Sequence, residues 1–343
     1  MEGTLSDKIV LPAIGGIERA RHNIRPWIDE TPLVRSELLS RALQAEVWIK
    51  NETVGPIASF KLRGALTHLI RAAGLKGAVT SSTGNHGQGV AYGARLLGVP
   101  SHIFLPAVNN PVKRAMIKAF GTTLHEVGED IDAAKAAARA FALQLGLEFV
   151  DDGESLDMMD GAGTVGLECA EQLDGIDCIF VPMGAATLFT GVATAIKARH
   201  PECRAIAVQA KGAPAMVESF HAGKAVEAPI DTVADGLACR VPASRALAGL
   251  IALADDAMTV SDGTMLQAVR AIAECAHVLV EPAGAAALAG AWARREEIRG
   301  ATVVLILSGA NIPHDVLSRA LAGPTLFTLE EAAAKGADWR HDG

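Results

Sequence analysis

The chain has 343 residues, half of them hydrophobic, which is enough for a large core and for two lobes of about 100–200 residues each. The net charge is −8 and no long run of lysine or arginine occurs, so we expect no nucleic-acid partner. No apolar run approaches the ~18 residues of a membrane span, and the N-terminus lacks a signal-peptide pattern. We therefore expect a cytoplasmic protein without a membrane partner. Aromatic residues make up only 4%, which favours an α/β architecture over an all-β one.

The first strongly patterned segment is "SFKLRGALTHLIRAAG", residues 59–74. Apolar side chains recur at i, i+4, i+7 and i+8 from Leu62, which predicts an amphipathic helix. Lys61 falls in its first turn, where the helix dipole disfavours a merely structural cation. Partial desolvation there would lower the pKa of the amine and make it a better nucleophile. The position alone equally fits a solvated surface lysine, as most lysines are.

Short β-rich runs alternate with helix-period segments along the rest of the chain. This alternation predicts right-handed βαβ units and mostly parallel, doubly wound sheets, in which ligands bind beyond the carboxyl ends of the strands. The clearest predicted strands are 77–82, 101–106, 122–127, 177–184, 204–210 and 302–309. We predict a smaller lobe of residues 77–151, inserted into a larger lobe of residues 1–76 and 152–343.

The strand predicted at 77–82 runs into a polar, glycine-rich turn, "SSTGNHG". Glycines such as Gly84 let the backbone approach a ligand closely, and N–H groups at the start of the following helix can bind a carboxylate or phosphate. Ser82, Thr83, Asn85 and His86 add polar side chains to the same turn. Simple helix capping by serine or threonine is the alternative interpretation. The number of polar groups in one turn favours a ligand site.

Five motifs in order carry a resemblance to a known family: "SFKLRGA", "SSTGNHGQGVAYGARLLGVP", "GAGTVGLE", "EPAGAAALAG" and "LSGAN". From about residue 13 to 322 the chain resembles the serine/threonine dehydratase (threonine ammonia-lyase) family of fold type II pyridoxal-phosphate enzymes, which includes serine racemase and hydroxyaspartate dehydratases. The resemblance implies a tryptophan synthase beta-like α/β fold of two parallel-sheet lobes with pyridoxal 5'-phosphate between them. It also implies a small amino-acid substrate and a homodimer.

The resemblance assigns cofactor roles to residues of these motifs. Lys61 matches the lysine that forms the Schiff base, Phe60 the residue against the pyridine ring, and Asn85 the asparagine that bonds the ring hydroxyl. Ser308 matches the partner of the pyridine nitrogen, and a neutral hydroxyl there favours elimination over transamination. Glu281 is placed near the ring, although a carboxylate at a helix N-terminus also has a purely structural interpretation.

The resemblance also assigns a substrate-binding turn. The residues implied to hold the substrate are Ser82, Thr83, Gly84, Asn85 and His86. Thr83 is in addition a catalytic candidate, because it stands where serine racemases have the serine that acts on the ring face opposite the lysine. The methyl group of Thr83 would hinder proton delivery from that side, so we expect racemase activity less than elimination.

The segment "PMGAATLFTG" departs from the family pattern, which has a run of glycines for the cofactor phosphate. Ala185, Ala186 and Thr187 occupy glycine positions, and only Gly184 remains. Alanine is unfavourable where φ is positive, so we expect an ordinary helix start or a displaced loop. Thr187 can offer a hydroxyl to the phosphate at the helix N-terminus. We still expect this loop to bind the phosphate through Gly184, Ala185, Ala186, Thr187 and Leu188.

The sequence predicts no metal site. Some members of the family bind a divalent cation through carboxylates, but the matching positions here are Gln209, Ala213 and Ala215, which supply too few oxygen ligands. The cysteines form no cluster of metal-ligand spacing and are interpreted as isolated buried thiols. They are Cys169, Cys178, Cys203, Cys239 and Cys275.

Together these observations predict a pyridoxal-phosphate-dependent ammonia-lyase that converts L-threonine or L-serine into a 2-oxo acid and ammonia. Lys61 would take the proton from Cα of the substrate. Three alternatives remain: a dehydratase of 3-hydroxyaspartate or another larger hydroxy amino acid, an amino-acid racemase, and a degenerate cofactor-binding protein with an altered phosphate loop.

Overall fold

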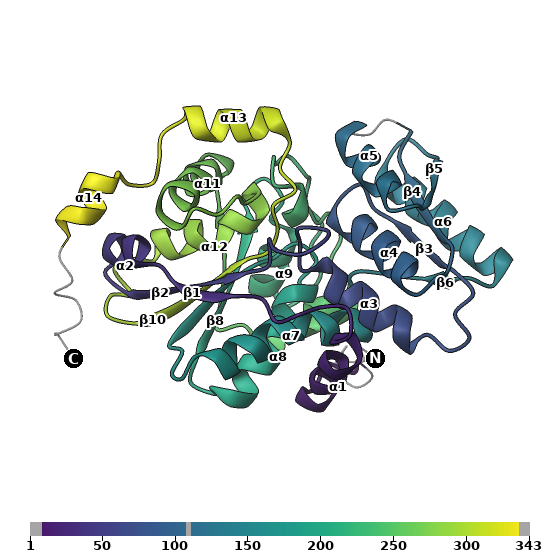
Figure 1. The fold of residues 1–343 in the computed structure, drawn as a ribbon, viewed down its shortest axis with the longest axis horizontal. Coiled ribbons are helices and arrows are strands. Elements are labelled where there is room, and N and C mark those ends of the chain that lie inside the picture. The colour runs from purple at the N-terminus through teal and green to yellow at the C-terminus, as the bar shows by residue number, and fades with distance from the viewer. Residues whose placement is uncertain (1–8, 108–110, 336–343) are drawn as a thin grey trace.

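Two β-sheets organise the fold of the computed structural model, which describes residues 9–107 and 111–335 (Figure 1). A six-stranded sheet has the order β1-β2-β10-β7-β8-β9, and a four-stranded sheet the order β5-β4-β3-β6. All neighbours pair in parallel except β1 and β2, so the predicted mostly parallel α/β class is confirmed. The strands are β1 (Leu33–Arg35), β2 (Glu46–Asn51), β3 (Ala78–Ser81), β4 (Ser101–Leu105), β5 (Thr123–Glu126), β6 (Glu148–Phe149), β7 (Cys178–Pro182), β8 (Arg204–Ala210), β9 (Asp256–Val260) and β10 (Thr302–Leu307).

Helices connect most of these strands, as the alternating pattern predicts. The segment predicted at 59–74 forms α3, and its first helical residue is Lys61. The helices are α1 (Ile14–Ile24), α2 (Glu37–Leu43), α3 (Lys61–Arg71), α4 (Asn85–Leu96), α5 (Pro111–Ala119), α6 (Ile131–Leu145), α7 (Leu156–Gln172), α8 (Thr187–Arg199), α9 (Ala215–Ala222), α10 (Ser244–Leu253), α11 (Asp262–Ala276), α12 (Pro282–Ala293), α13 (His314–Ala322) and α14 (Leu329–Ala334), with one 3₁₀ turn, η2 (Asp235–Leu237).

The six-stranded sheet is buried on both faces because its two middle strands, β7 and β10, are almost entirely apolar. Along β10, Val303 and Leu305 belong to a core with α2, α11 and α12, whereas Val304 and Ile306 belong to a second core with α7, α8 and α10. Successive side chains of a strand point to opposite faces, so a continuous apolar run such as "VVLIL" requires cover on both. The sheet therefore forms the middle layer between two layers of helices.

The four-stranded sheet is likewise covered on both faces. Val79 and Phe104 pack with the alanines of α6, while Ala78 and Ile103 pack with side chains of α3 and α4. Helix α3 also packs on α7, a helix that covers the six-stranded sheet. It therefore lies between the six-stranded and the four-stranded sheets (Figure 1). The N-terminus of α3, and with it Lys61, is placed at this junction.

The five cysteines are buried, as expected. Burial raises the pKa of the Cys169 thiol to about 12, so it stays protonated and unreactive at neutral pH. Among the residues described, no helix is both long and apolar enough to cross a membrane.

Candidate active site

Lys61 is held at the start of α3 by contacts to the end of β10. The backbone N–H of Phe60 donates to the Ser308 carbonyl at 3.1 Å, and Ala310 N–H donates to the Ala58 carbonyl at 2.9 Å. The Lys61 side chain is only 15% exposed, and its Nζ lies 4.9 Å from the centroid of the Phe60 ring. The amine is therefore largely withdrawn from solvent and pairs with Asp152, unlike the solvated lysine of the alternative interpretation.

Asn85, Glu281 and Asn311 form a polar chain that joins three of the motifs. Asn85 Nδ2 donates to Glu281 Oε1 at 2.6 Å, and Asn311 Nδ2 donates to Asn85 Oδ1 at 2.7 Å. Gly309 fits beside this chain because it has no side chain: a Cβ there would lie 2.5 Å from Glu281 Oε1. Ser308, next to Gly309, is buried. Asn311 was not identified from the sequence, although the motif "SGAN" contains it.

The turn at residues 81–87 presents backbone donors rather than a capped helix end. In the described part of the chain, no side chain caps the N-terminus of α4, where Gly84 is the N-cap residue. The first N–H groups of an α-helix lack intrahelical acceptors, so those of α4 are available to an anion. Ser82 and Thr83 are partly exposed in the same turn, and Ser82 Oγ accepts from Gly84 N–H at 3.2 Å.

The His86 imidazole points into the protein from the first turn of α4. Its Nε2 lies 2.9 Å from Thr80 Oγ1 and 3.2 Å from the Val150 carbonyl. Burial lowers the pKa of this ring, so it is neutral at pH 7. Because Thr80 Oγ1 already donates to the Val150 carbonyl at 2.8 Å, Nε2 carries the proton. The side chain of His86 thus stabilises the turn.

The conformation of the 184–188 loop differs from the one expected from its sequence. Ala186 is the N-cap residue of α8 and adopts φ 60° and ψ 7°, so alanine does occupy a left-handed position and the expectation that it would avoid one is wrong. The buried surroundings impose this conformation at a local cost of about 1–2 kcal/mol. Gly184 is required by packing, since a Cβ would lie 2.5 Å from the Gly236 carbonyl. The loop thus keeps a left-handed residue at position 186, although that residue is alanine and not glycine.

The N-terminus of α8 is open to an anion in the same way as that of α4. Thr190 N–H donates to the Ala186 carbonyl at 2.8 Å and is the first intrahelical donor, which leaves the N–H groups of Thr187 and Leu188 without acceptors in the helix. No side chain caps this end within the described residues. The Thr187 hydroxyl donates to the backbone carbonyl of Asp152, so its oxygen keeps its acceptor character and its position is fixed.

Asp152 is the main site residue that was missed in the sequence. It follows β6, and its carboxylate accepts a hydrogen bond from Lys61 Nζ. Burial alone would raise the pKa of this carboxyl, but the neighbouring charge of Lys61 lowers it, so the group is ionised. A cavity of about 130 Å³ adjoins it, lined by residues that include His86, Asp152 and Ala185. A second missed carboxylate, Asp235 of η2, faces Gly84.

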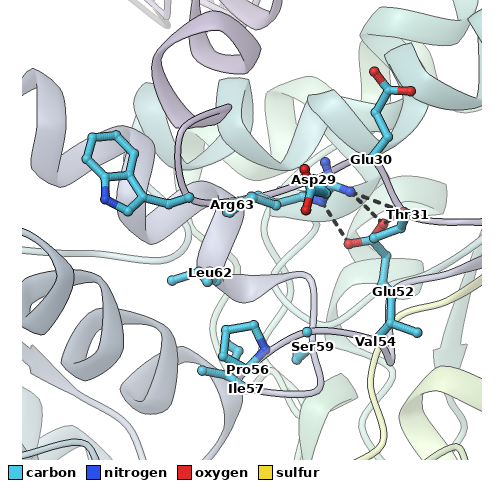
Figure 2. A pocket seen from close by; sticks show the side chains of 13 residues that line it. Asp29, Glu30, Thr31, Glu52, Val54, Pro56, Ile57, Ser59, Leu62 and Arg63 are labelled. Carbon is cyan, nitrogen blue, oxygen red and sulfur yellow. Dashed lines mark hydrogen bonds and ion pairs between the residues drawn. The ribbon is translucent and has the colours of Figure 1, made fainter.

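A buried charge cluster of Lys50, Glu52, Arg63 and Glu168 anchors the first turn of α3 beneath the site. Arg63, two residues after Lys61, donates to Glu52 at 2.8 and 3.0 Å and to Glu168 at 2.9 Å. Two cations face two carboxylates, so the cluster is neutral overall. Figure 2 shows Arg63 directed at Glu52 and Thr31, beside a second cavity of about 290 Å³ whose lining does not include Lys61. The cluster fixes α3 to β2 and α7.

Comparison with known proteins agrees with this geometry. A family model described as pyridoxal-phosphate dependent enzyme matches residues 24–309. The chain belongs to this family. It is 36% identical over 306 residues to L-threonine ammonia-lyase of Geobacter sulfurreducens, a match that covers 88% of this chain and 76% of that protein. These matches confirm the predicted family and its cofactor, pyridoxal phosphate.

Two solved structures extend the comparison to the fold. Maize serine racemase superposes with a TM-score of 0.85 at 30% identity, covering 91% of this chain and 97% of that one. A second structure, titled threonine deaminase, superposes with a TM-score of 0.84 at 31% identity, covering 88% of this chain and 99% of that one. The predicted fold type II architecture is thereby confirmed, and this member of the family is a pyridoxal-phosphate-dependent enzyme.

The residues present fit the cofactor. An aldehyde needs an amine, which Lys61 supplies, and a phosphate dianion needs donors, which the open N-terminus of α8 supplies. Ring substituents need neutral hydrogen-bonding groups. The buried Ser308 lies on the segment that holds the start of α3, and Asn85 is joined to that segment through Asn311. One buried acceptor, Asp152 Oδ1, has no hydrogen-bond partner among the described residues.

Proposed function

We propose that the protein is an ammonia-lyase that converts L-threonine or L-serine into the corresponding 2-oxo acid and ammonia. The observation that carries this proposal is the Lys61 amine, which is withdrawn from solvent, paired with Asp152 and held by a segment that is hydrogen-bonded to Ser308. The relative named L-threonine ammonia-lyase and the structure titled threonine deaminase support the choice of reaction. The substrate is proposed from these relatives, because a fold by itself does not determine a substrate.

The bound cofactor would supply the electron-withdrawing group that makes the substrate Cα proton acidic. In our proposal Lys61 holds the cofactor through Nζ and, when released by substrate, accepts the Cα proton at that same atom. Phe60 packs against the cofactor ring, Asn85 bonds its hydroxyl, and Ser308 bonds its nitrogen. The first N–H groups of α8 would hold the phosphate, and the Thr187 hydroxyl, which already donates to the Asp152 carbonyl, would fix the loop that presents them.

The substrate carboxylate would bind at the 81–87 turn, where the first N–H groups of α4 are uncapped and Ser82 and Thr83 are partly exposed. Holding the carboxylate fixes the direction of the Cα–H bond relative to Lys61, which is a positioning effect on the reaction rate. Glu281, through Asn85, keeps the amide in one orientation. Thr83 remains a candidate for proton transfer on the face opposite Lys61.

We further propose that residues 77–151 form a small domain that closes over the substrate, and that residues 1–76 and 152–343 form the large domain that binds the cofactor. The four-stranded sheet and its helices support this division. Closure would exclude water from the junction where Lys61 lies. A homodimer and a cytoplasmic location are also part of the proposal, on the resemblance and on composition respectively.

Racemisation is the second candidate, favoured by the superposition on maize serine racemase. A carboxylate beside the lysine, Asp152, disfavours an anionic side chain such as that of 3-hydroxyaspartate. The 184–188 loop does not support the interpretation as a degenerate cofactor-binding protein, because Ala186 keeps the left-handed geometry there.

The test combines absorbance with a substrate panel. The purified protein with added pyridoxal phosphate is expected to show the visible band of lysine-bound cofactor, and Lys61→Ala is expected to lack it. Lys76→Ala, an exposed lysine just beyond α3, is the matched control and should keep the band. Ammonia and 2-oxo acid are then measured with L-threonine, L-serine and 3-hydroxyaspartate, and D-serine with chiral chromatography. Absence of the band in the wild type after cofactor addition would refute the catalytic proposal.

A further inference from the structure

Asp152 is positioned by the fold to control the Lys61 amine. It lies on the connection from β6 to α7, by which the chain leaves the four-stranded sheet and returns to the helices of the six-stranded sheet. Its carboxylate accepts from Lys61 Nζ, and its backbone carbonyl accepts from the Thr187 hydroxyl at the N-terminus of α8. One residue therefore contacts both the amine and the 184–188 loop.

The carboxylate is only partly paired. Asp152 Oδ2 is engaged by Lys61, whereas Oδ1 is buried and has no hydrogen-bond partner among the described residues. A buried acceptor without a donor is costly, typically about 1–3 kcal/mol, so its retention suggests a role other than stability.

Other charges around the pair do not replace Asp152. His86 on α4 is neutral, and Lys135 on α6 pairs with Asp151 at 3.1 Å. Arg139, also on α6, pairs with Asp151 as well. Asp151 is therefore neutralised by α6, and Asp152 is the carboxylate that remains for Lys61.

We propose that Asp152 is the positioning residue of Lys61: it holds the amine through the Nζ hydrogen bond and, once the lysine is linked to pyridoxal phosphate, keeps a proton on the lysine nitrogen. This inference rests on the proposed role of Lys61. A protonated nitrogen makes the linked carbon more electrophilic toward the substrate amine. The same carboxylate stabilises the ammonium that forms when Lys61 accepts the Cα proton.

The test is a pH titration of the visible band of the lysine-bound cofactor, which needs no turnover. A carboxylate within ~4–6 Å of a cationic nitrogen shifts its pKa by about 1–3 units, so Asp152→Asn is expected to lower the midpoint of the titration by about 1 unit or more. Asp152→Glu, which keeps the charge, should restore at least half of the shift. Asp151→Asn is the matched control, since its carboxylate faces Lys135 and Arg139, and its midpoint should equal that of the wild type.

The outcomes separate this inference from the proposed function. A midpoint in Asp152→Asn that equals those of the wild type and Asp151→Asn would overturn the role of Asp152 while leaving the proposed function intact, because the band itself reports that Lys61 binds the cofactor. Circular dichroism checks that each variant folds. Should Asp152→Asn fail to fold, the uncharged variant Asp152→Ser takes its place: a midpoint lowered relative to the wild type supports the role, and an unchanged midpoint contradicts it.

Discussion

Removing the lysine from the buried charge cluster should destabilise the protein strongly. Lys50 is completely buried on β2, and its Nζ donates to the Thr31 carbonyl at 2.7 Å, to Glu168 at 2.7 Å and to Gln172 at 3.2 Å. Lys50→Met keeps most of the volume but leaves one positive charge, that of Arg63, to balance two carboxylates. Breaking a buried pair by removing one partner costs about 3–5 kcal/mol, a large part of a total stability of about 5–15 kcal/mol.

The measurement is equilibrium unfolding in urea, followed by circular dichroism and tryptophan fluorescence. Lys197→Met is the matched control: Lys197 pairs with Asp255 at 2.6 Å, but both side chains are partly exposed, so the loss should be below about 1 kcal/mol. The double variant Lys50→Met, Glu168→Gln restores neutrality and should lose less free energy than the two single changes added together. Strict additivity, or a loss for Lys50→Met no larger than for the control, would refute the electrostatic reasoning.

Three further outcomes are expected. Gly309→Ala would place a methyl group 2.5 Å from Glu281, so it should weaken cofactor binding at least about tenfold in a titration of the visible band. Gly15→Ala is the control: its methyl group would lie 3.5 Å from the nearest atom, so the affinity for the cofactor should not change. Ala186→Gly relieves a left-handed residue and should add about 1 kcal/mol of stability, so a lower melting temperature would contradict the strain. Burial would raise the pKa of Glu168, but the ion pairs with Arg63 and Lys50 lower the pKa below 4.5. The stabilisation that Glu168 contributes is therefore complete above pH 4.5 and is lost as the pH falls through the pKa of the folded state. Urea unfolding at several pH values should show this dependence, and Glu168→Gln should flatten it.

The elements that carry the strongest local patterns were predictable. The six strands expected from the sequence occur as β3, β4, β5, β7, β8 and β10, and the helix that begins at Lys61 has the expected apolar stripe. These segments combine β-branched runs or a helical repeat with clear turn residues, so local signals and tertiary packing agree. The family and cofactor followed from motifs within these same segments.

The contacts of the site were less predictable because they join distant segments. β6 has only two residues, too short for an alternating pattern, so no local signal placed Asp152 just beyond the end of a strand. Lys61 and Asp152 are 91 positions apart, and tertiary contacts bring them together: the pairing of β6 with β3 places the Asp152 segment, and contacts with the end of β10 place the start of α3. Ala186 is the opposite case, because here a local rule gave the wrong answer. Alanine rarely adopts a positive φ, but the packing around Ala186 imposes one.

The four-stranded sheet begins and ends at neighbouring points, since Ala78 of β3 pairs with Glu148 of β6. A segment with adjoining ends can be exchanged, lengthened or redesigned without rethreading the rest of the chain. The 81–87 turn lies inside that segment, whereas Lys61 and the 184–188 loop lie outside it. In the proposed function, the turn that binds the substrate carboxylate therefore lies in one segment and the residues that hold the cofactor lie outside it, so sequence changes can alter the two parts independently.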